Sequence, residues 1–291
     1  MDKGAVSPRR QWGLLAALLA ANVALAMGPW MVRVADSGPV SAAFWRLALA
    51  LPVLALLARG TGQRLAGMPR RALLLVAIGS VAFAFDLASW HIGIERTRLG
   101  NATLFGNSGS IVLLFWGFVV GQILPRRLDL AAIALALGGA AILLGRSLEI
   151  SFATLVGDLF CLAAGLFYAV YLLTLQDARR AFGSWSLLTL VALFAAPVLL
   201  VLAVMRGEPV WPTDWIPLLV LAATSQIIGQ GLMVYCLRHF PPLVIGLALL
   251  TQPAIAALYG YWRFGEVLGA LDILGMAMLG GALAVSRART A

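Results

Sequence analysis

The chain repeats its own sequence pattern once, and this internal duplication restricts the folds open to it. Matching residues recur about 144 positions apart, in the order Gly13 and Gly157, Pro52 and Pro197, and Gly121-Gln122 and Gly265-Glu266. Each copy holds five apolar stretches. Because five is odd, two tandem copies enter a membrane in opposite orientations. Inverted repeats of this kind are typical of secondary transporters, whose substrate site lies between the halves near the bilayer midplane.

The composition indicates a membrane protein made of helices. Hydrophobic residues make up 62% of the 291 positions and charged residues only 11%, which is too apolar for a single soluble core. Lipid offers no hydrogen-bond partner to a free backbone group, so the spans must be helices or a closed barrel. The apolar runs are continuous and do not alternate with polar residues, which argues against a barrel.

Ten apolar stretches approach the roughly 20 residues that a spanning helix needs. We therefore predict an all-α integral membrane protein whose ten transmembrane helices form two inverted five-helix repeats, at 1–147 and 148–291. The run near the N-terminus is too long for a typical signal peptide and is interpreted as an uncleaved first helix. The predicted spans are 12–34, 41–58, 72–94, 102–122, 129–146, 154–176, 185–205, 215–237, 243–262 and 269–286.

The positive charges predict the orientation of these spans. Alternate loops carry fourteen Lys and Arg residues on one side and six on the other, so the positive-inside rule places both termini in the cytoplasm. We expect a multi-pass protein of the bacterial inner membrane. The net charge of +9 is interpreted as topology signals and contact with anionic lipid headgroups of the bilayer, and not as a nucleic-acid surface.

The sequence argues against an enzyme. It contains no HExxH, GxSxG or phosphate-loop motif, and two separated histidines do not build a typical metal site. Cys161 and Cys236 both fall inside predicted spans and indicate neither a disulfide framework nor metal ligands. We expect no metal and no cofactor. A membrane scaffold or sensor stays open as an alternative, although such a protein has no need of paired inverted halves.

Ionisable residues inside spans are costly and therefore candidates for function. Asp86 is the deepest acid, and Arg46 reaches a similar depth from the opposite face. A buried Arg46–Asp86 ion pair would lower the cost of both charges. Two roles are open for it, a structural ion pair or a part in substrate binding and gating. For Asp158 and Glu266, near helix ends, capping is the expected role.

Polar and aromatic residues inside the spans suit an uncharged or zwitterionic ligand. Amides hydrogen-bond both ammonium and carboxylate groups, and aromatic walls stack against rings. Interfacial aromatic belts and plain packing are the alternative explanation for each residue. Pro29 and Pro253 are either hinges or fixed bends. The candidate substrate-binding residues are Asn22, Phe83, Asp86, Trp90, Asn101, Asn107, Tyr168, Tyr171, Gln226, Gln230 and Met233.

The second half contains a recognisable series of residues: Gly157-Asp158, Pro253, Gly265-Glu266, Gly275, Gly280-Gly281 and Arg287. This series resembles the EamA repeat of the drug/metabolite transporter superfamily. The first half matches less closely. It has the aromatic-Arg segment Phe44-Trp45-Arg46, but Gln122 stands where a glutamate is expected. The proline that would correspond to Pro253 is absent, and residues 107–110 (Asn-Ser-Gly-Ser) stand in its place.

Within the superfamily, the whole chain most resembles the YddG-type exporters of aromatic amino acids. The resemblance implies two inverted five-helix repeats around a central cavity, lined mainly by helices 1, 3, 4, 6, 8 and 9. It also implies export of a small-molecule substrate, an aromatic amino acid, from cytoplasm to periplasm. Other small metabolites or lipophilic drugs are the alternative substrates. No ATP-binding motif is present, so a gradient is the expected driving force, while the oligomeric state is left open.

Overall fold

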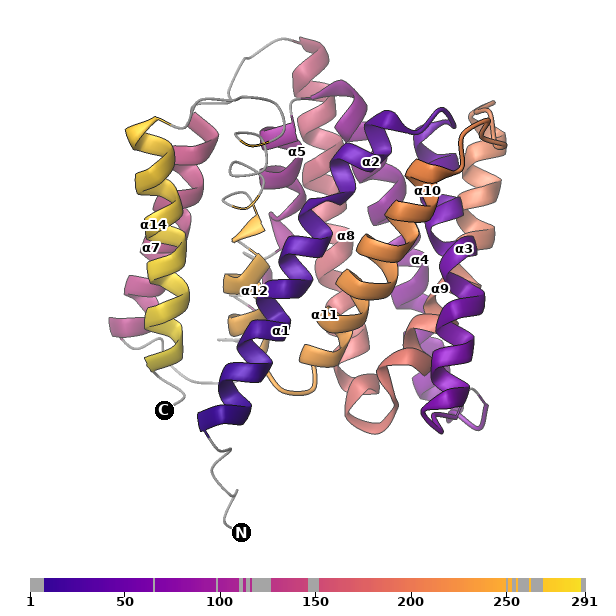
Figure 1. Ribbon diagram of the computed structural model, residues 1–291, viewed down its shortest axis with the longest axis horizontal. Helices are drawn as coiled ribbons and strands as arrows, with labels where there is room; N and C mark the ends of the chain where they lie inside the picture. Colours follow the sequence, from indigo (N-terminus) through magenta and orange to yellow (C-terminus); the bar gives the residue numbers. More distant parts are fainter. Residues whose placement is uncertain are drawn as a thin grey trace.

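The computed structural model describes the greater part of the chain, and this part is built from helices (Figure 1). The predicted spans 102–122 and 243–262 fall only partly within it, and Pro253 lies outside it. The described residues are 8–64, 66–97, 99–109, 112–113, 116, 127–145, 152–249, 251–252, 255, 262 and 269–288.

The helices of the first half follow the predicted spans, with one interruption. The predicted span 12–34 is divided at Met27 into α1 and α2, with Pro29 in the first turn of α2. Proline is well tolerated there because the first amides of a helix have no partner inside it. The helices are α1 (Pro8–Ala26), α2 (Gly28–Val34), α3 (Pro39–Gly60), α4 (Arg70–Arg96), α5 (Leu99–Gly106) and α7 (Arg127–Gly145).

The second half contains a feature that the sequence did not predict. The span 215–237 is a helical run in which a π-helix, η1, lies between two short α-helices. π-helices are rare and occur frequently at functional sites. The elements are α8 (Phe152–Ala181), α9 (Ser184–Met205), α10 (Ile216–Leu221), η1 (Ala222–Gln230), α11 (Gly231–Cys236), α12 (Pro242–Leu249) and α14 (Ala270–Ala288).

Among the described residues, six helical segments are long and apolar enough to cross a membrane: Trp12–Val34, Pro39–Gly60, Arg70–Arg96, Leu155–Gln176, Ser184–Met205 and Ile216–Cys236. Large apolar side chains such as Leu56, Leu74 and Val201 are exposed on these helices. An apolar outer surface of this kind is unfavourable in water and suits contact with lipid.

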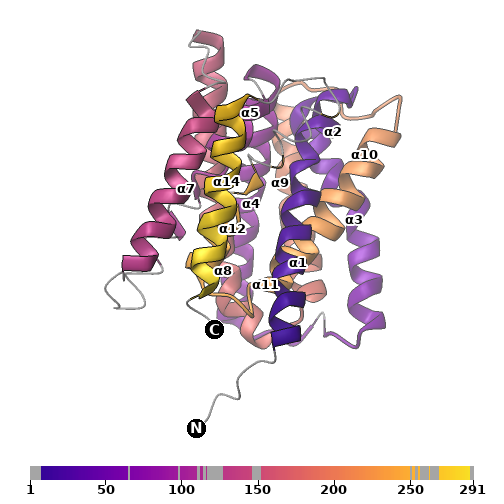
Figure 2. The ribbon, with the colours of Figure 1, turned by 60° about the vertical axis from the view of Figure 1, so that its left-hand side comes forward.

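Small residues bring the central helices close together. In the α4–α8 pair, a Cβ atom added at Gly93 would overlap Cys161, and one added at Gly79 would overlap Thr174. Close backbone approach is what glycine provides between helices in a membrane. Two further pairs, α3 with α9 and α7 with α14, form opposite edges of the bundle (Figure 1). The start of α1 and the end of α14 lie at the same end of the bundle (Figures 1 and 2).

Candidate functional site

A cavity lies between the two halves of the chain and mixes opposite charges, amides and aromatic rings. It is bounded by α1, α3, α4, α5, α8 and η1, together with residues that follow α5 and α12. The cavity volume is about 50 Å³, counted as space open to the centres of water molecules; one water needs about 10–15 Å³ on the same measure. The lining residues are Leu25, Arg46, Phe83, Asp86, Leu87, Trp90, Thr103, Gly106, Asn107, Tyr168, Gln230 and Gln252.

Arg46 and Asp86 supply one basic and one acidic side chain to this cavity. Arg46 is 2% exposed and Asp86 is 8% exposed, so both are well removed from the surface. The Nε atom of Arg46 donates a hydrogen bond to Oε1 of Gln226 at 3.2 Å. Within the described part of the chain, no ion pair of 4.0 Å or less joins Arg46 to Asp86. The expected ion pair between Arg46 and Asp86 is therefore not formed, and both side chains line the cavity.

The guanidinium has a hydrogen-bond partner from the other half of the chain. Gln226 comes from η1 in the second half, and its Oε1 atom accepts the hydrogen bond from Nε of Arg46. A buried charge is tolerated only where other polar groups compensate for the lost water. Here the compensation comes from an amide on one side and from the polar cavity on the other.

Aromatic rings form one wall of the cavity. Phe83 stacks on Tyr171 with a centroid separation of 4.4 Å and lies 6.4 Å from the ring of Tyr168. On the same face of α4, the Nε1 atom of Trp90 donates to the carbonyl oxygen of Ala102 at 3.3 Å. The backbone approaches this indole closely at Gly106, where a Cβ atom would lie 2.9 Å from Nε1. These contacts hold the rings in place as rigid, partly polar walls.

Two amides continue the polar lining. The Nε2 atom of Gln230 donates to the Tyr168 hydroxyl at 3.2 Å, and the Tyr171 hydroxyl donates to Oε1 of Gln230 at 3.5 Å. The Nε2 atom of Gln252 donates to Oδ1 of Asn22 at 2.9 Å. Asn22 in turn donates from Nδ2 to the carbonyl oxygen of Leu18 at 2.8 Å. The amides are therefore oriented by neighbouring hydroxyl, amide and backbone groups.

The structure divides the predicted residues into three groups. The first group lines the cavity: Arg46, Phe83, Asp86, Trp90, Asn107, Tyr168 and Gln230. The second group, Asn22, Tyr171 and Gln226, lies behind the wall and contacts lining residues. Met233 forms the third, because it is fully buried in the apolar core and not at the cavity. The Asn101 side chain and Pro253 lie outside the described residues.

Sequence reasoning missed five lining residues, Leu25, Leu87, Thr103, Gly106 and Gln252. The duplication offered a signal for one of them. Gln252 follows Asn107 by 145 positions, the offset that separates Pro52 from Pro197, so the two amides occupy equivalent places in the two copies. Asp86 and Gln230 are related by an offset of 144 in the same way. The cavity is thus lined by matched residues from both repeats.

The chemistry of the lining is suited to binding. Charged groups of both signs, hydroxyls and amides converge in a mostly apolar pocket, which is the usual composition of a small-molecule site. In the ranges that the structure describes, no three His, Cys, Asp or Glu side chains gather as metal ligands would. The lining can therefore hold a ligand that has both a carboxylate and an ammonium group.

Comparisons with known proteins relate most of the chain to known transporters. The model of the EamA-like transporter family matches residues 11–145 and again residues 155–287. The threonine/homoserine exporter RhtA of Escherichia coli K12 is 27% identical over 249 residues, covering 84% of this chain and 79% of RhtA. The same exporter from Salmonella typhimurium SL1344 is 27% identical over 251 residues, covering 83% and 81%.

More distant similarities cover the chain as well. An uncharacterized transporter of Archaeoglobus fulgidus is 26% identical over 214 residues, covering 73% of this chain and 75% of the relative. A solved protein crystal structure superposes with a TM-score of 0.79 at 14% identity and covers 98% of both chains. At this identity the superposition establishes a shared fold and nothing about the ligand.

Proposed function

Because the chain belongs to the EamA-like transporter family, we propose that it exports neutral amino acids through the cavity between its halves. Members of this family are transporters and not enzymes, and this chain is a multi-pass protein of the inner membrane. One observation carries the proposal. Arg46 and Asp86 are both buried at the same cavity, and neither neutralises the other through a direct ion pair.

A zwitterion is the ligand that satisfies this arrangement. A ligand with only one charge leaves the second buried charge of the protein without a counter-ion, which is strongly unfavourable. An amino acid pairs its carboxylate with Arg46 and its ammonium group with Asp86. The guanidinium suits a carboxylate because its nitrogens match the two carboxylate oxygens. The aromatic wall then takes the amino acid side chain.

The proposed architecture is ten transmembrane helices in two inverted repeats, 1–147 and 148–291, with both termini in the cytoplasm. Three observations support it. The family model matches two successive segments of the chain. The start of α1 and the end of α14 lie at the same end of the bundle (Figure 2), as an even number of crossings requires. The uneven distribution of Lys and Arg between alternate loops assigns that end to the cytoplasm.

Alternating access around the cavity is the proposed mechanism. Transporters of this type bind substrate where membrane helices are interrupted, because an irregular backbone can line a cavity. Two interruptions adjoin the cavity here. Leu25 lines it just before the α1–α2 break, and Gln230 lines it at the end of η1. The two interrupted segments also touch, since a Cβ atom at Gly28 would lie 3.0 Å from the Ser225 hydroxyl oxygen.

Two amino acid classes are favoured by different observations. Phe83, Trp90 and Tyr168 favour an aromatic substrate, because stacking adds to the burial of a ring. Thr103 and the amides Gln230 and Gln252 favour a small hydroxylated substrate, and the relatives named threonine/homoserine exporters point the same way. We propose aromatic amino acids as the first candidate class and threonine or homoserine as the second.

Counterflow in proteoliposomes separates these classes. Purified protein is reconstituted with trapped unlabelled phenylalanine, threonine or homoserine, and uptake of the labelled form is measured against empty liposomes. The proposal expects uptake that depends on a trapped amino acid and falls in the Gln230→Ala variant. The better substrate identifies the class. Folded protein that moves none of the three amino acids would contradict the proposal.

A further inference from the structure

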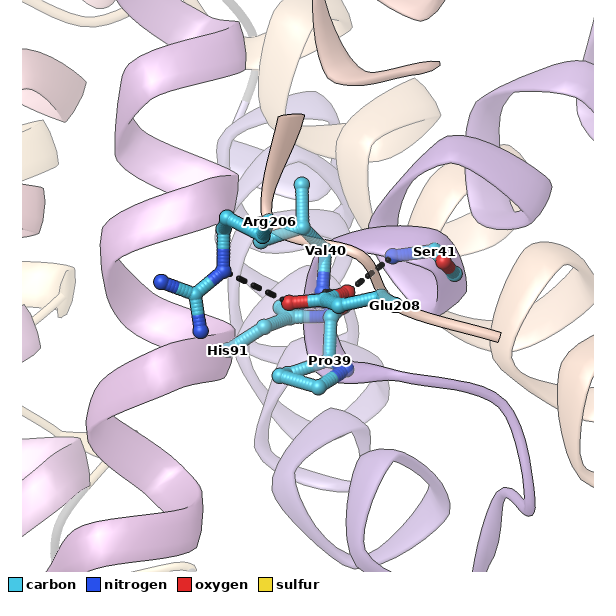
Figure 3. Close-up of polar contacts among 6 residues, drawn as sticks. All are labelled: Pro39, Val40, Ser41, His91, Arg206 and Glu208. Carbon is cyan, nitrogen blue, oxygen red and sulfur yellow. Dashed lines mark hydrogen bonds and ion pairs between the residues drawn. The ribbon is translucent and has the colours of Figure 1, made fainter. Parts of the chain in front are cut away.

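The helices α3 and α9 cap one another at both ends. Glu208 follows the last residue of α9 by three positions, and its side chain reaches the start of α3. Its Oε2 atom accepts hydrogen bonds from the backbone nitrogens of Val40 at 2.8 Å and Ser41 at 3.0 Å (Figure 3). These amides have no partner within their own helix. The end of a helix from the second repeat thus completes a helix of the first.

The opposite end of the pair repeats this arrangement with the roles exchanged. Gln63 follows the last residue of α3 by three positions and reaches the start of α9. Its Oε1 atom accepts hydrogen bonds from the backbone nitrogens of Trp185 at 3.0 Å and Ser186 at 3.2 Å. Each helix is therefore capped by the side chain that follows its neighbour, and the two helices run antiparallel.

The backbone that presents each cap is also duplicated. Each helix is followed, two residues after its last position, by a glycine with a left-handed backbone, Gly62 with φ of 69° and Gly207 with φ of 66°. The next amide turns back on the helix in each case, from Gln63 to Ala58 O at 2.8 Å and from Glu208 to Ala203 O at 3.1 Å. This is the Schellman ending of a helix, which requires a left-handed residue. It directs the following side chain away from its own helix.

A second pair of glycines makes room for the caps. Gly38 precedes α3 and Gly183 precedes α9. A Cβ atom at Gly38 would lie 2.6 Å from Cβ of Glu208, and one at Gly183 would overlap the Gln63 side chain. Each residue of one cap lies 145 positions from its counterpart in the other, as Gln63 does from Glu208 and Gly38 from Gly183. The same offset relates Pro52 to Pro197. The inverted repeat is thus visible in individual hydrogen bonds.

The Glu208 end carries further polar contacts, one of which joins the two halves. Arg206 holds the other carboxylate oxygen, with its Nε atom 2.7 Å from Oε1 of Glu208, and the Glu208 side chain is only 7% exposed (Figure 3). The indole Nε1 of Trp45 donates to the carbonyl oxygen of Val210 at 2.6 Å. From α4, Nδ1 of His91 lies 2.9 Å from the carbonyl oxygen of Pro39, in the first turn of α3 (Figure 3).

We infer that α3 and α9 form a rigid pair that stays closed at both ends throughout the transport cycle. The inference rests on the proposed transport by alternating access. Each helix has 22 residues and is therefore about 33 Å long, so the caps lie at the two faces of the bilayer. Opening either end would remove the partner of two helix amides. The movements that open the cavity therefore belong to other helices, and Arg46 on α3 keeps its place.

Disulfide cross-links test whether either end has to open. At the Glu208 end, Asp36→Cys and Thr213→Cys replace two exposed residues whose side chains hydrogen-bond to one another. At the other end, Gln63→Cys and Gly183→Cys use the close approach of these two positions. The native cysteines, Cys161 and Cys236, are free and buried. A variant with all four new cysteines closes both ends of the same molecule.

The expected result is that counterflow of the fully cross-linked protein stays within about twofold of the same protein after reduction. Loss of tenfold or more that reduction restores, at either end, would overturn the inference. Failure of the proposed function has a different signature, because the wild-type protein and the reduced variants would then all be inactive. In that case the test is whether the four-cysteine variant, in membranes, forms both disulfides within the same molecule. Failure to form both would refute the inference.

Cap variants provide a second test if the cysteine variants do not fold. Because glutamine performs the same role at position 63, Glu208→Gln is expected to keep both melting temperature and KM. Glu208→Ala is expected to lower the melting temperature while KM changes less than twofold. A severalfold change in KM at an unchanged melting temperature would show that the cap opens during transport, which contradicts a permanently closed pair.

Discussion

Arg46 of the first repeat and Gln226 of the second are joined by a hydrogen bond of 3.2 Å between Nε and Oε1. Both side chains are buried, and the Nε2 atom of Gln226 has no hydrogen-bond partner among the described residues. The bond fixes the inner nitrogen of the guanidinium and leaves its two terminal nitrogens for the cavity. We therefore propose that Gln226 positions Arg46 for a substrate carboxylate.

Replacing Gln226 with leucine is expected to weaken substrate binding without abolishing folding. Loss of a hydrogen bond to a charged group costs about 1.5–3 kcal/mol, so we expect KM in counterflow to rise by roughly tenfold or more. Gln226→Asn keeps a neutral amide acceptor and is the matched control, with a smaller change in KM. An unchanged KM in Gln226→Leu would show that the bond does not position Arg46.

Neutralising either cavity charge is expected to abolish uptake of zwitterions. Asp86→Asn and Arg46→Gln keep approximate shape, but each leaves one substrate charge unpaired, which costs several kcal/mol in a buried site. The exchange variant Arg46→Asp/Asp86→Arg separates two interpretations. A purely structural ion pair would be restored by the exchange, whereas two charges that bind separate substrate groups would not. Recovery of uptake in the exchange variant would therefore argue for a structural pair.

Gly106 is expected to control the size of the substrate. A Cβ atom there would lie 2.9 Å from Nε1 of Trp90, so Gly106→Ala pushes the indole toward the cavity. Uptake of phenylalanine should fall more than uptake of threonine, because the larger side chain loses its space first. Trp90→Ala should have the opposite effect on size preference. The measurement is the ratio of initial uptake rates, and an equal loss for both amino acids would contradict this role.

Gly165 on α8 is expected to be essential for packing. A Cβ atom there would overlap the Ser108 hydroxyl and lie 2.7 Å from the carbonyl oxygen of Gly106. Gly165→Ala should lower the melting temperature strongly, because overpacking typically costs about 1–3 kcal/mol. Gly13→Ala is the matched control, since nothing lies within 4 Å of its added Cβ, and it should be neutral or slightly stabilising. Equal melting temperatures for both variants would refute this packing contact.

A pH effect is expected in the loops at the Glu208 end. The Thr213 hydroxyl and the backbone amides of Thr213 and Asp214 donate to the Asp36 carboxylate and hold the pKa of Asp36 below its usual value. A carboxylate whose pKa is lowered in the folded state stabilises the fold at pH values above its ordinary pKa. This contribution to stability is lost as the pH falls through the lowered pKa. Wild type should therefore melt above Thr213→Val at pH 7, and the difference should shrink as the pH falls below the ordinary Asp pKa of about 3.9. A difference that persists at low pH would contradict this assignment.

Much of the helical fold follows from the sequence, because apolar length and small residues are visible in it. Phe83, Asp86 and Trp90 recur at three- and four-residue spacing on α4, and all three line the cavity. The prediction failed where the helix was irregular. Gln226, Gln230 and Met233 recur at the spacing of one α-helical face. However, η1 is a π-helix with a different period, and the three residues reach Arg46, Tyr168 and the apolar core.

Long-range partners are the other part that the sequence did not contain. Arg46 and Asp86 were expected to pair because their depths agree, but depth alone does not say which neighbour is nearer, and Gln226 holds the guanidinium. The caps by Gln63 and Glu208 depend on two helix ends meeting across the repeats. The duplicated glycines Gly62 and Gly207 are visible in the sequence, and in the structure each directly precedes one of these caps.

The most direct test of the central claim is inhibition of wild-type counterflow by substrate analogues that lack one charge. Phenylalanine and threonine are compared with their amine and carboxylic acid counterparts, which lack the carboxylate and the ammonium group respectively. If Arg46 and Asp86 bind the two ends of a zwitterion, only the intact amino acids compete strongly, and each single-charge analogue inhibits at least tenfold less well. Equal inhibition by an amine or an acid analogue would contradict the account.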